Sequence, residues 1–175
     1  MAQLSDLWTS WRDAQRPAPY MLLDAAGLEQ GAAGIPREAF SELECLFTGD
    51  LATELGDVAP YLARLAGWDD MVRNTADQLL RAHLGMLVLP ALSMQALTFA
   101  ELHRHFRKHN VVYGPEGNPL FFRYYDPRVL PDVLEVFDAG QLEAFFGPVE
   151  QLILVDSAGR TVTCSRQAGK LVTAG

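Results

Sequence analysis

Positive charge is scarce in this sequence. Its 175 residues include 14 Lys and Arg against 22 Asp and Glu, which gives a net charge of −8 at pH 7. An acidic surface repels phosphate backbones, so we do not expect a nucleic acid partner. Hydrophobic residues make up 49% of the chain and charged residues 21%, a balance typical of a folded globular protein. The length suits one domain spanning residues 1–175.

Cysteine and long apolar runs are also scarce. Cys45 and Cys164 lie far apart, and two cysteines do not make a disulfide framework. We therefore expect two reduced thiols, as in a cytoplasmic protein. The longest apolar run, GMLVLPAL, is too short to span a bilayer and is interrupted by Pro90. No secretory signal is visible at the N-terminus, so the sequence predicts a cytoplasmic protein without a membrane partner.

Motifs that carry enzyme chemistry are not found in the sequence. It contains no GxSxG, no GxxxxGK[ST] and no GxGxxG pattern. Neither cysteine has an adjacent histidine, and Asp69 and Asp70 are best explained as the start of a helix. We expect no catalytic residue, no cofactor and no enzymatic activity. Carboxylates that are distant in sequence can still converge in a fold, so an enzyme with a dispersed polar site is kept as an alternative.

Hydrophobic periodicity predicts a mixture of helices and strands. Helices are expected at residues 4–11, 36–43, 68–84, 98–110, 127–137 and 138–147. Strands are expected at residues 20–24, 58–65 and 86–92, in a hairpin over 111–125, and as two strands over 151–167. A further short strand that runs into a turn is expected over residues 45–50. The predicted class is α/β (α+β), with a single mixed sheet of about five or six strands and flanking helices.

Capping signals mark several helix boundaries. Thr98 and Glu101 have the spacing of a capping box, and so do Asp138 and Gln141. Gly85 follows the helix over 68–84 and is predicted to end it with a positive φ.

The segment ELHRHFRKHN raises the question of a metal site. His105 and His109 are four residues apart and share a helix face, as two metal ligands do. The segment lacks the HExxH pattern and has no identifiable third ligand, while His103 falls on the apolar stripe. We therefore expect no metal, and we interpret the outer face of this helix as basic and solvated.

The same helix carries the most concentrated positive charge. Arg104, Arg107 and Lys108 stand against Glu101, which gives a local charge of +2. In a chain of net charge −8, such a patch can bind an acidic surface of another protein, or it can serve solubility alone. Both interpretations are kept.

The segment PLFFRYYDPRVLPDVLEVF places charge inside an apolar run. If LFFRYY forms a strand, both of its faces are aromatic and Arg123 requires a carboxylate partner. Asp24 and Asp126 are the candidates. Asp126 and Pro127 also suit the N-cap and first position of a helix. Pro131 then either makes the first turn irregular or marks the start of the regular helix.

Five segments occur in an order that resembles a known family: YMLLDAA, LFTGD with VAPYLARL, FAELHRHFRKHNVV, GNPLFFRYYDPRVL and LEAFFGPVEQLILVDSAG. Together they resemble the adaptor (effector-chaperone) domain of bacterial type VI secretion systems, first catalogued as a domain of unknown function. The resemblance runs from about residue 20 to residue 159, and FRYYDPRVL is its most specific part.

The resemblance implies a non-enzymatic protein that binds a toxic effector in the cytoplasm and helps to load it onto the secretion spike protein. The residues assigned a structural role are Asp24, Arg123, Asp126 and Pro127. The residues assigned to partner binding are Arg104, Arg107, Lys108, Tyr125 and Arg128. Family members often carry a further variable region after the shared domain, and this sequence ends soon after it. An immunity-type protein that neutralises a toxin is kept as an alternative.

Overall fold

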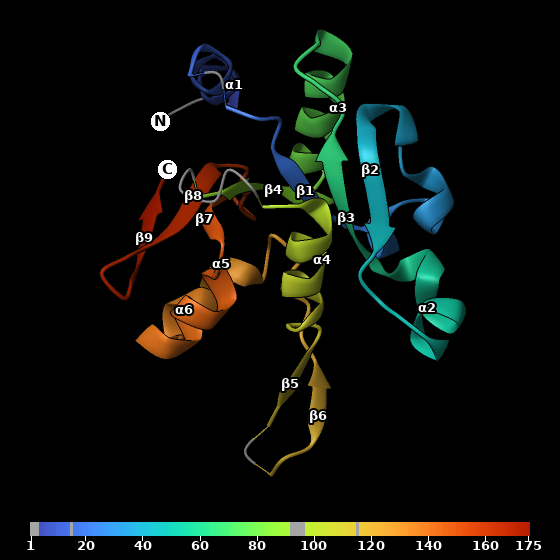
Figure 1. Ribbon diagram of the computed structural model, residues 1–175, viewed down its shortest axis with the longest axis vertical. Helices are drawn as coiled ribbons and strands as arrows, with labels where there is room; N and C mark the ends of the chain where they lie inside the picture. Colours follow the sequence, from blue (N-terminus) through green and yellow to red (C-terminus); the bar gives the residue numbers. More distant parts are fainter. Residues whose placement is uncertain (1–3, 15, 92–96, 115) are drawn as a thin grey trace.

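The centre of the protein is a seven-stranded antiparallel sheet with the strand order β2-β3-β1-β4-β7-β8-β9 (Figure 1). The computed structural model describes residues 4–14, 16–91, 97–114 and 116–175. The strands of this sheet are β1 (Tyr20–Asp24), β2 (Phe40–Cys45), β3 (Pro60–Leu65), β4 (Gly85–Pro90), β7 (Val149–Val155), β8 (Thr161–Gln167) and β9 (Lys170–Ala174). A separate hairpin is formed by β5 (Val111–Tyr113) and β6 (Pro119–Phe121).

Helices cover both faces of the sheet. They are α1 (Leu4–Asp13), α2 (Asp50–Leu55), α3 (Asp70–Arg81), α4 (Phe99–Arg107), α5 (Leu130–Val136) and α6 (Ala139–Phe146). Short 3₁₀ helices occupy Ala25–Gly27, Gly31–Gly34, Arg37–Ala39 and Gly56–Val58. The predicted mixed class with flanking helices is therefore confirmed, although the main sheet has more strands than expected and all its pairings are antiparallel.

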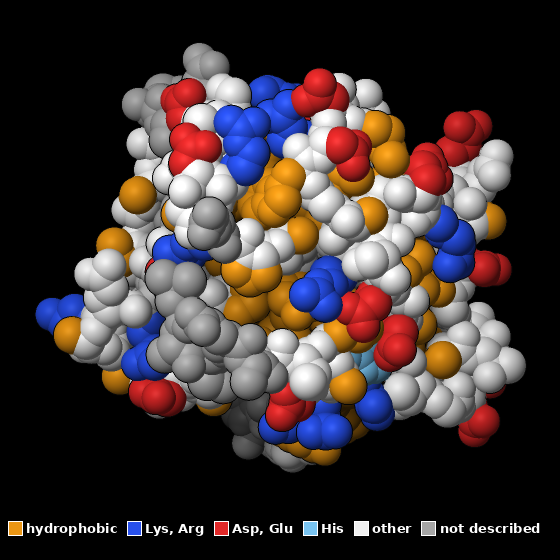
Figure 2. All heavy atoms as spheres, turned by 45° about the horizontal axis from the view of Figure 1, so that its top comes forward, with side chains coloured by type: hydrophobic (Ala, Val, Ile, Leu, Met, Phe, Trp, Pro, Cys, Tyr) orange, Lys and Arg blue, Asp and Glu red, His pale blue; other side chains and the backbone are white. Residues whose placement is uncertain are grey.

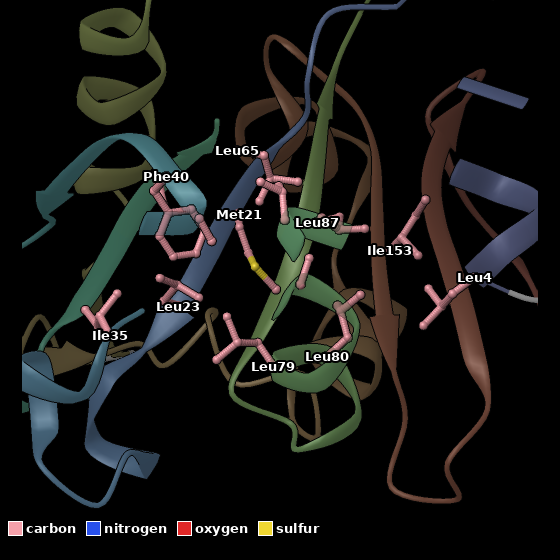
Figure 3. Close-up of a cluster of buried hydrophobic side chains, with 14 of the residues drawn as sticks. Leu4, Met21, Leu23, Ile35, Phe40, Leu65, Leu79, Leu80, Leu87 and Ile153 are labelled. Carbon is pink, nitrogen blue, oxygen red and sulfur yellow. The ribbon is translucent and has the colours of Figure 1, made fainter. Parts of the chain in front are cut away.

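The central strand β1 is buried on both faces, which explains its uninterrupted apolar sequence. Met21 and Leu23 join a core with α1 and α3, whereas Tyr20 and Leu22 join a second core with α4, α5 and α6. Figure 3 shows Met21 pointing toward α3 in the first core. The sheet therefore separates two cores.

The predicted capping boxes are both confirmed. The Thr98 hydroxyl accepts a hydrogen bond from the Glu101 N–H, and the Glu101 carboxylate accepts one from the Thr98 N–H. Asp138 and Gln141 make the same reciprocal pair at the start of α6. These caps satisfy backbone donors that have no partner within the helix.

Two sequence predictions fail, one at β2 on the sheet edge and one at the start of the central strand β4. Residues 36–43 form a 3₁₀ turn followed by β2, because SELEC is a half-exposed edge strand paired with β3. Gly85 does not end a helix with a positive φ. The residue with a positive φ is His83, at 57°, whose Nδ1 lies 3.0 Å from the Val155 carbonyl oxygen. Gly85 instead begins β4 beside β1, where a Cβ atom would lie 2.5 Å from the Leu22 carbonyl oxygen.

We predict that Gly85→Ala lowers the free energy of unfolding by about 1–3 kcal/mol, since the new methyl group must displace the backbone of β1. Urea denaturation provides the measurement. Gly56→Ala is the matched control, because no atom lies within 4 Å of the position that a Cβ would take there, and its φ of −55° suits alanine. Equal effects of the two substitutions would contradict the close-approach explanation.

Candidate functional site

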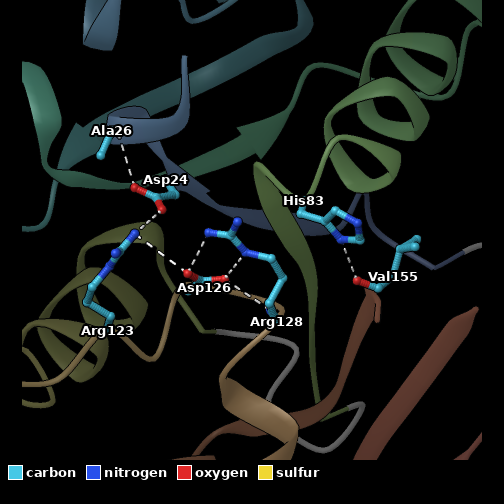
Figure 4. Close-up of polar contacts among 7 residues, drawn as sticks. All are labelled: Asp24, Ala26, His83, Arg123, Asp126, Arg128 and Val155. Carbon is cyan, nitrogen blue, oxygen red and sulfur yellow. Dashed lines mark hydrogen bonds and ion pairs between the residues drawn. The ribbon is translucent and has the colours of Figure 1, made fainter. Parts of the chain in front are cut away.

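The candidate site lies where the loop over residues 122–129 meets the end of β1. Asp24 is the last residue of that strand, and its side chain is only 3% exposed. One carboxylate oxygen accepts a hydrogen bond from the Ala26 N–H at 3.1 Å, and the other accepts one from the Arg123 guanidinium at 2.7 Å (Figure 4). The loop is thereby attached to the centre of the sheet.

A second carboxylate continues the contact. Asp126 Oδ1 accepts hydrogen bonds from the Arg128 backbone N–H at 3.0 Å and from its Nε at 2.9 Å. Asp126 Oδ2 accepts a hydrogen bond from the Arg128 guanidinium at 2.9 Å. The same oxygen lies 3.6 Å from the Arg123 guanidinium. We call Asp24, Arg123, Asp126 and Arg128 the four-charge cluster. Both predicted partners of Arg123 therefore contact it.

The four-charge cluster has buried anions and half-exposed cations. The Asp126 side chain is 4% exposed, whereas those of Arg123 and Arg128 are 50% and 53% exposed. Burial alone would raise the pKa of Asp126, but hydrogen bonds from Arg128 outweigh it and lower that pKa. Burial acts to lower the pKa of Arg123, and its bond to Asp24 overcomes this effect and raises it. Asp126 and Arg123 therefore both remain charged near neutral pH.

The loop differs from the predicted strand and helix. Strand β6 ends at Phe121, so the alternation expected through LFFRYY does not continue. Asp126 does not cap α5, which starts at Leu130 with Pro131 in its first turn. The alternative that Pro131 marks the start of the regular helix is confirmed. Asp126 instead closes a local turn through the Arg128 N–H, and Pro127 within that turn is buried.

Tyr125 packs inside the loop. Its side chain is 7% exposed, and the Arg123 guanidinium carbon lies 5.9 Å from the centre of its ring. Burial and the nearby Asp24 carboxylate raise the pKa of its hydroxyl. This geometry leaves little of the ring for a partner to reach and supports the orientation of Arg123.

Sequence reasoning missed the buried anchor beside the cluster. Tyr124 is completely buried and stacks on Phe106 at 5.9 Å, with its hydroxyl 2.9 Å from the Phe106 carbonyl oxygen. That hydroxyl also lies 3.2 Å from Asn110 Oδ1, and Asn110 Nδ2 donates to the Leu46 carbonyl at 2.7 Å. No local pattern in the sequence identifies this anchor, because Asn110 and Tyr124 meet only in the fold.

The cations of α4 form a separate group. Arg104, Arg107 and Lys108 are exposed on one side of the helix, and Arg107 donates to the Thr48 hydroxyl at 3.2 Å. Within the residues that the structure describes, none of the cluster's ion pairs involves these three side chains. On the face shown in Figure 2, acidic and basic side chains are interspersed around a central hydrophobic area.

The histidines in and just after α4 divide into two groups. His103 is buried, as its place on the apolar stripe predicts, with Nε2 2.8 Å from the Cys45 carbonyl oxygen. The expectation of a solvated outer face is wrong for the other two. His105 and His109 turn toward α6 and are half-buried: His105 Nε2 lies 2.8 Å from the Phe145 carbonyl oxygen, and the His109 ring lies 5.2 Å from the Phe145 ring. Among residues 4–14, 16–91, 97–114 and 116–175, no group of three or more metal-ligating side chains is found.

A groove of about 550 Å³ runs beside α5 and the last two strands of the sheet. Arg128 and Asp132 line it from one side, and Arg160 and Thr173 from the other. Arg128 therefore takes part in the four-charge cluster and also forms a wall of this groove. This double placement refines the expectation that Arg128 is free to face a partner, because two of its guanidinium nitrogens already bind Asp126 while its side chain is half-exposed.

The fold and site define an α+β protein in which a loop is fixed to a central antiparallel sheet by buried carboxylates. Residues 19–144 match the family described as Domain of unknown function (DUF4123), and the match covers more than half of the chain, so the protein belongs to this family. No curated protein and no solved structure matches the chain. Across the part of the chain that the structure describes, no helix has both the length and the apolarity needed to cross a membrane.

We predict that Arg123→Ala lowers the free energy of unfolding by about 1–3 kcal/mol, because it leaves the Asp24 carboxylate buried without its charged donor. Thermal and urea denaturation measure the change. Arg12→Ala is the control, since Arg12 pairs with Asp13 at an exposed site and such pairs contribute about 0–1 kcal/mol. Unchanged stability in Arg123→Ala would contradict the proposed anchoring.

We also predict a pH dependence from His109. Burial, with smaller effects of His105 and Lys108, lowers its pKa from 6.5 to about 4. As pH falls, His109 therefore becomes protonated near pH 6.5 in the unfolded chain but only near pH 4 in the folded protein. Stability should fall by about 2 kcal/mol between pH 7 and pH 5 through this residue. In His109→Gln, urea titrations should show a smaller loss over that interval; an unchanged slope would contradict the assignment.

Proposed function

We propose that this protein is an adaptor that binds a type VI secretion effector in the cytoplasm and helps to load it onto the secretion spike protein. The proposal rests on the ordered motif resemblance and on membership of the DUF4123 family. The observation that carries it is the role of FRYYDPRVL, the most specific part of that resemblance. Its charged residues hold a loop in place, and they do so with their charges already paired.

The chemistry of the buried groups favours binding over catalysis. A general base works best with a pKa near the operating pH, whereas Arg128 lowers the pKa of Asp126. A nucleophilic thiol requires a lowered pKa, whereas burial raises the pKa of Cys164 to about 11. These groups therefore suit a scaffold better than they suit a dispersed active site.

An adaptor must contact two proteins, and the molecule offers two surfaces of different character. One is the exposed cationic side of α4, with Arg104, Arg107 and Lys108. The other is the groove beside α5 and β9, which has both cations and anions in its walls. The cationic side of α4 suits an acidic partner surface, because opposite charges steer association. Binding through it should weaken as salt concentration rises, because salt screens these charges.

The experiment is affinity purification of the tagged chain from its native bacterial lysate, with bound proteins identified and quantified by mass spectrometry. We expect recovery of a secretion spike protein together with a large toxin. Arg104→Glu with Arg107→Glu should lower recovery of one partner about tenfold, the size expected for loss of a charged binding surface. Arg12→Glu is the exposed control and should leave recovery unchanged.

The same experiment separates the alternatives. Recovery of a toxin alone, together with loss of that toxin's activity on binding, would favour an immunity-type protein. Reproducible recovery of the tagged chain alone would contradict the adaptor proposal. Loss of a measured catalytic turnover on replacing Asp126 would instead favour an enzyme.

A further inference from the structure

The β5–β6 hairpin exposes apolar side chains away from both cores. It projects from the end of α4 in Figure 1, and its strands are joined by three residue pairs. All six strand residues are exposed. Tyr113 is 75% exposed, Phe121 65% and Leu120 52%. A two-stranded hairpin is only marginally stable by itself, and these exposed side chains contribute little to the stability of the folded protein.

The register divides the hairpin into two faces. Val111 lies opposite Phe121, and Tyr113 lies opposite Pro119, so these four side chains share one face. Val112 and Leu120 form the other face. We call the first the Phe121 face.

The Phe121 face continues onto the body of the protein. The Phe121 ring lies 6.3 Å from the ring of Phe47, which is 9% exposed. The next residue, Thr48, accepts a hydrogen bond from Arg107. The apolar surface formed by Phe121 and Phe47 therefore lies beside the cation Arg107. Arg104 lies on the same side of α4, because it is three residues before Arg107, and Lys108 follows directly at the C-cap of the helix.

We propose that the Phe121 face and the neighbouring α4 cations form a docking surface for an acidic, apolar segment of a protein partner. Within the proposed function, this segment belongs to the effector, so the inference rests on that function. The segment buries apolar side chains against Phe121 and Tyr113 and places carboxylates beside Arg107 and Arg104. The charges select this partner, because the patch is locally positive on a chain of net charge −8.

Two other occupants fit the charges less well. A symmetric dimer through the Phe121 face would place the locally positive patches of both copies in one interface. An anionic membrane presents negative charge over a wide area, which the rest of a chain of net charge −8 repels, whereas a single segment contacts only the locally positive patch. The protein segment avoids both repulsions.

The test is selection of a phage-displayed library of random 12-residue peptides on the immobilised full chain, followed by fluorescence anisotropy with the enriched peptides. We expect enrichment of peptides that combine Asp or Glu with aromatic or aliphatic residues. Tyr113→Ser with Phe121→Ser should weaken their binding at least about tenfold, as expected when central apolar contacts are lost. Arg104→Glu with Arg107→Glu should weaken it similarly and reduce its salt dependence.

The matched control is Val112→Ser with Leu120→Ser, on the opposite face of the same hairpin. It should change the dissociation constant by no more than about twofold, because it leaves the Phe121 face intact. Circular dichroism and urea denaturation check that both double variants are folded. Enrichment of basic peptides, no enrichment, or equal binding by both double variants would overturn the proposal.

Two further measurements examine the other occupants. Sedimentation velocity detects self-association, and flotation with phosphatidylglycerol–phosphatidylcholine vesicles detects membrane binding. Either one, if abolished by Tyr113→Ser with Phe121→Ser, would overturn the assignment to a protein segment. In the native lysate, a toxin retained by this double variant would refute the docking surface and leave the adaptor function standing. A toxin absent from the unmodified chain would refute the adaptor function itself.

Discussion

The hydrogen bond between Asp24 and Arg123 is the constraint on which this structure depends. It joins residues 99 positions apart, the end of the central strand and a loop with no regular structure. A carboxylate that is 3% exposed needs a charged donor, because an isolated buried charge is costly. The loop over residues 122–129 therefore has to place the Arg123 guanidinium beside Asp24. Asp126 and Arg128 complete the arrangement with a second buried carboxylate and an outer guanidinium, so the path of residues 122–129 is determined by electrostatics as much as by packing.

Much of the fold can be predicted from local signals. The apolar run of β1 and the caps of α4 and α6 depend on neighbouring residues, and the sequence displays them directly. Edge strands are harder to predict, since they bury little. Strand β9 shows no clear alternation of apolar and polar residues, because its residues are mostly exposed. The sequence predicts a helix at the start of β2, because the strand character of β2 comes from pairing with β3, which the local sequence does not show. The constraint on Gly85 comes from the Leu22 carbonyl across the sheet, which no local pattern reveals.

The site shows the same division. The need of Arg123 for a carboxylate follows from its apolar surroundings, and both predicted partners contact it. The conformation of the loop cannot be predicted in this way. Tyr124 leaves the strand direction in order to reach the end of α4 and Asn110, and that partner is defined only by the tertiary fold. The burial of His105 and His109 is equally hidden, because the sequence does not show that α6 packs against them.

The four-charge cluster also links stability to the surfaces available for binding. The loop over residues 122–129 begins immediately after β6 and ends where α5 starts. Arg123 is two residues from Phe121, so the bond to Asp24 limits how the hairpin can turn relative to Phe47. At the other end, Arg128 is held by Asp126 while it lines the groove beside α5. A motif with its charges paired internally therefore sets the relative positions of the hairpin and the groove, the two surfaces that we propose for binding.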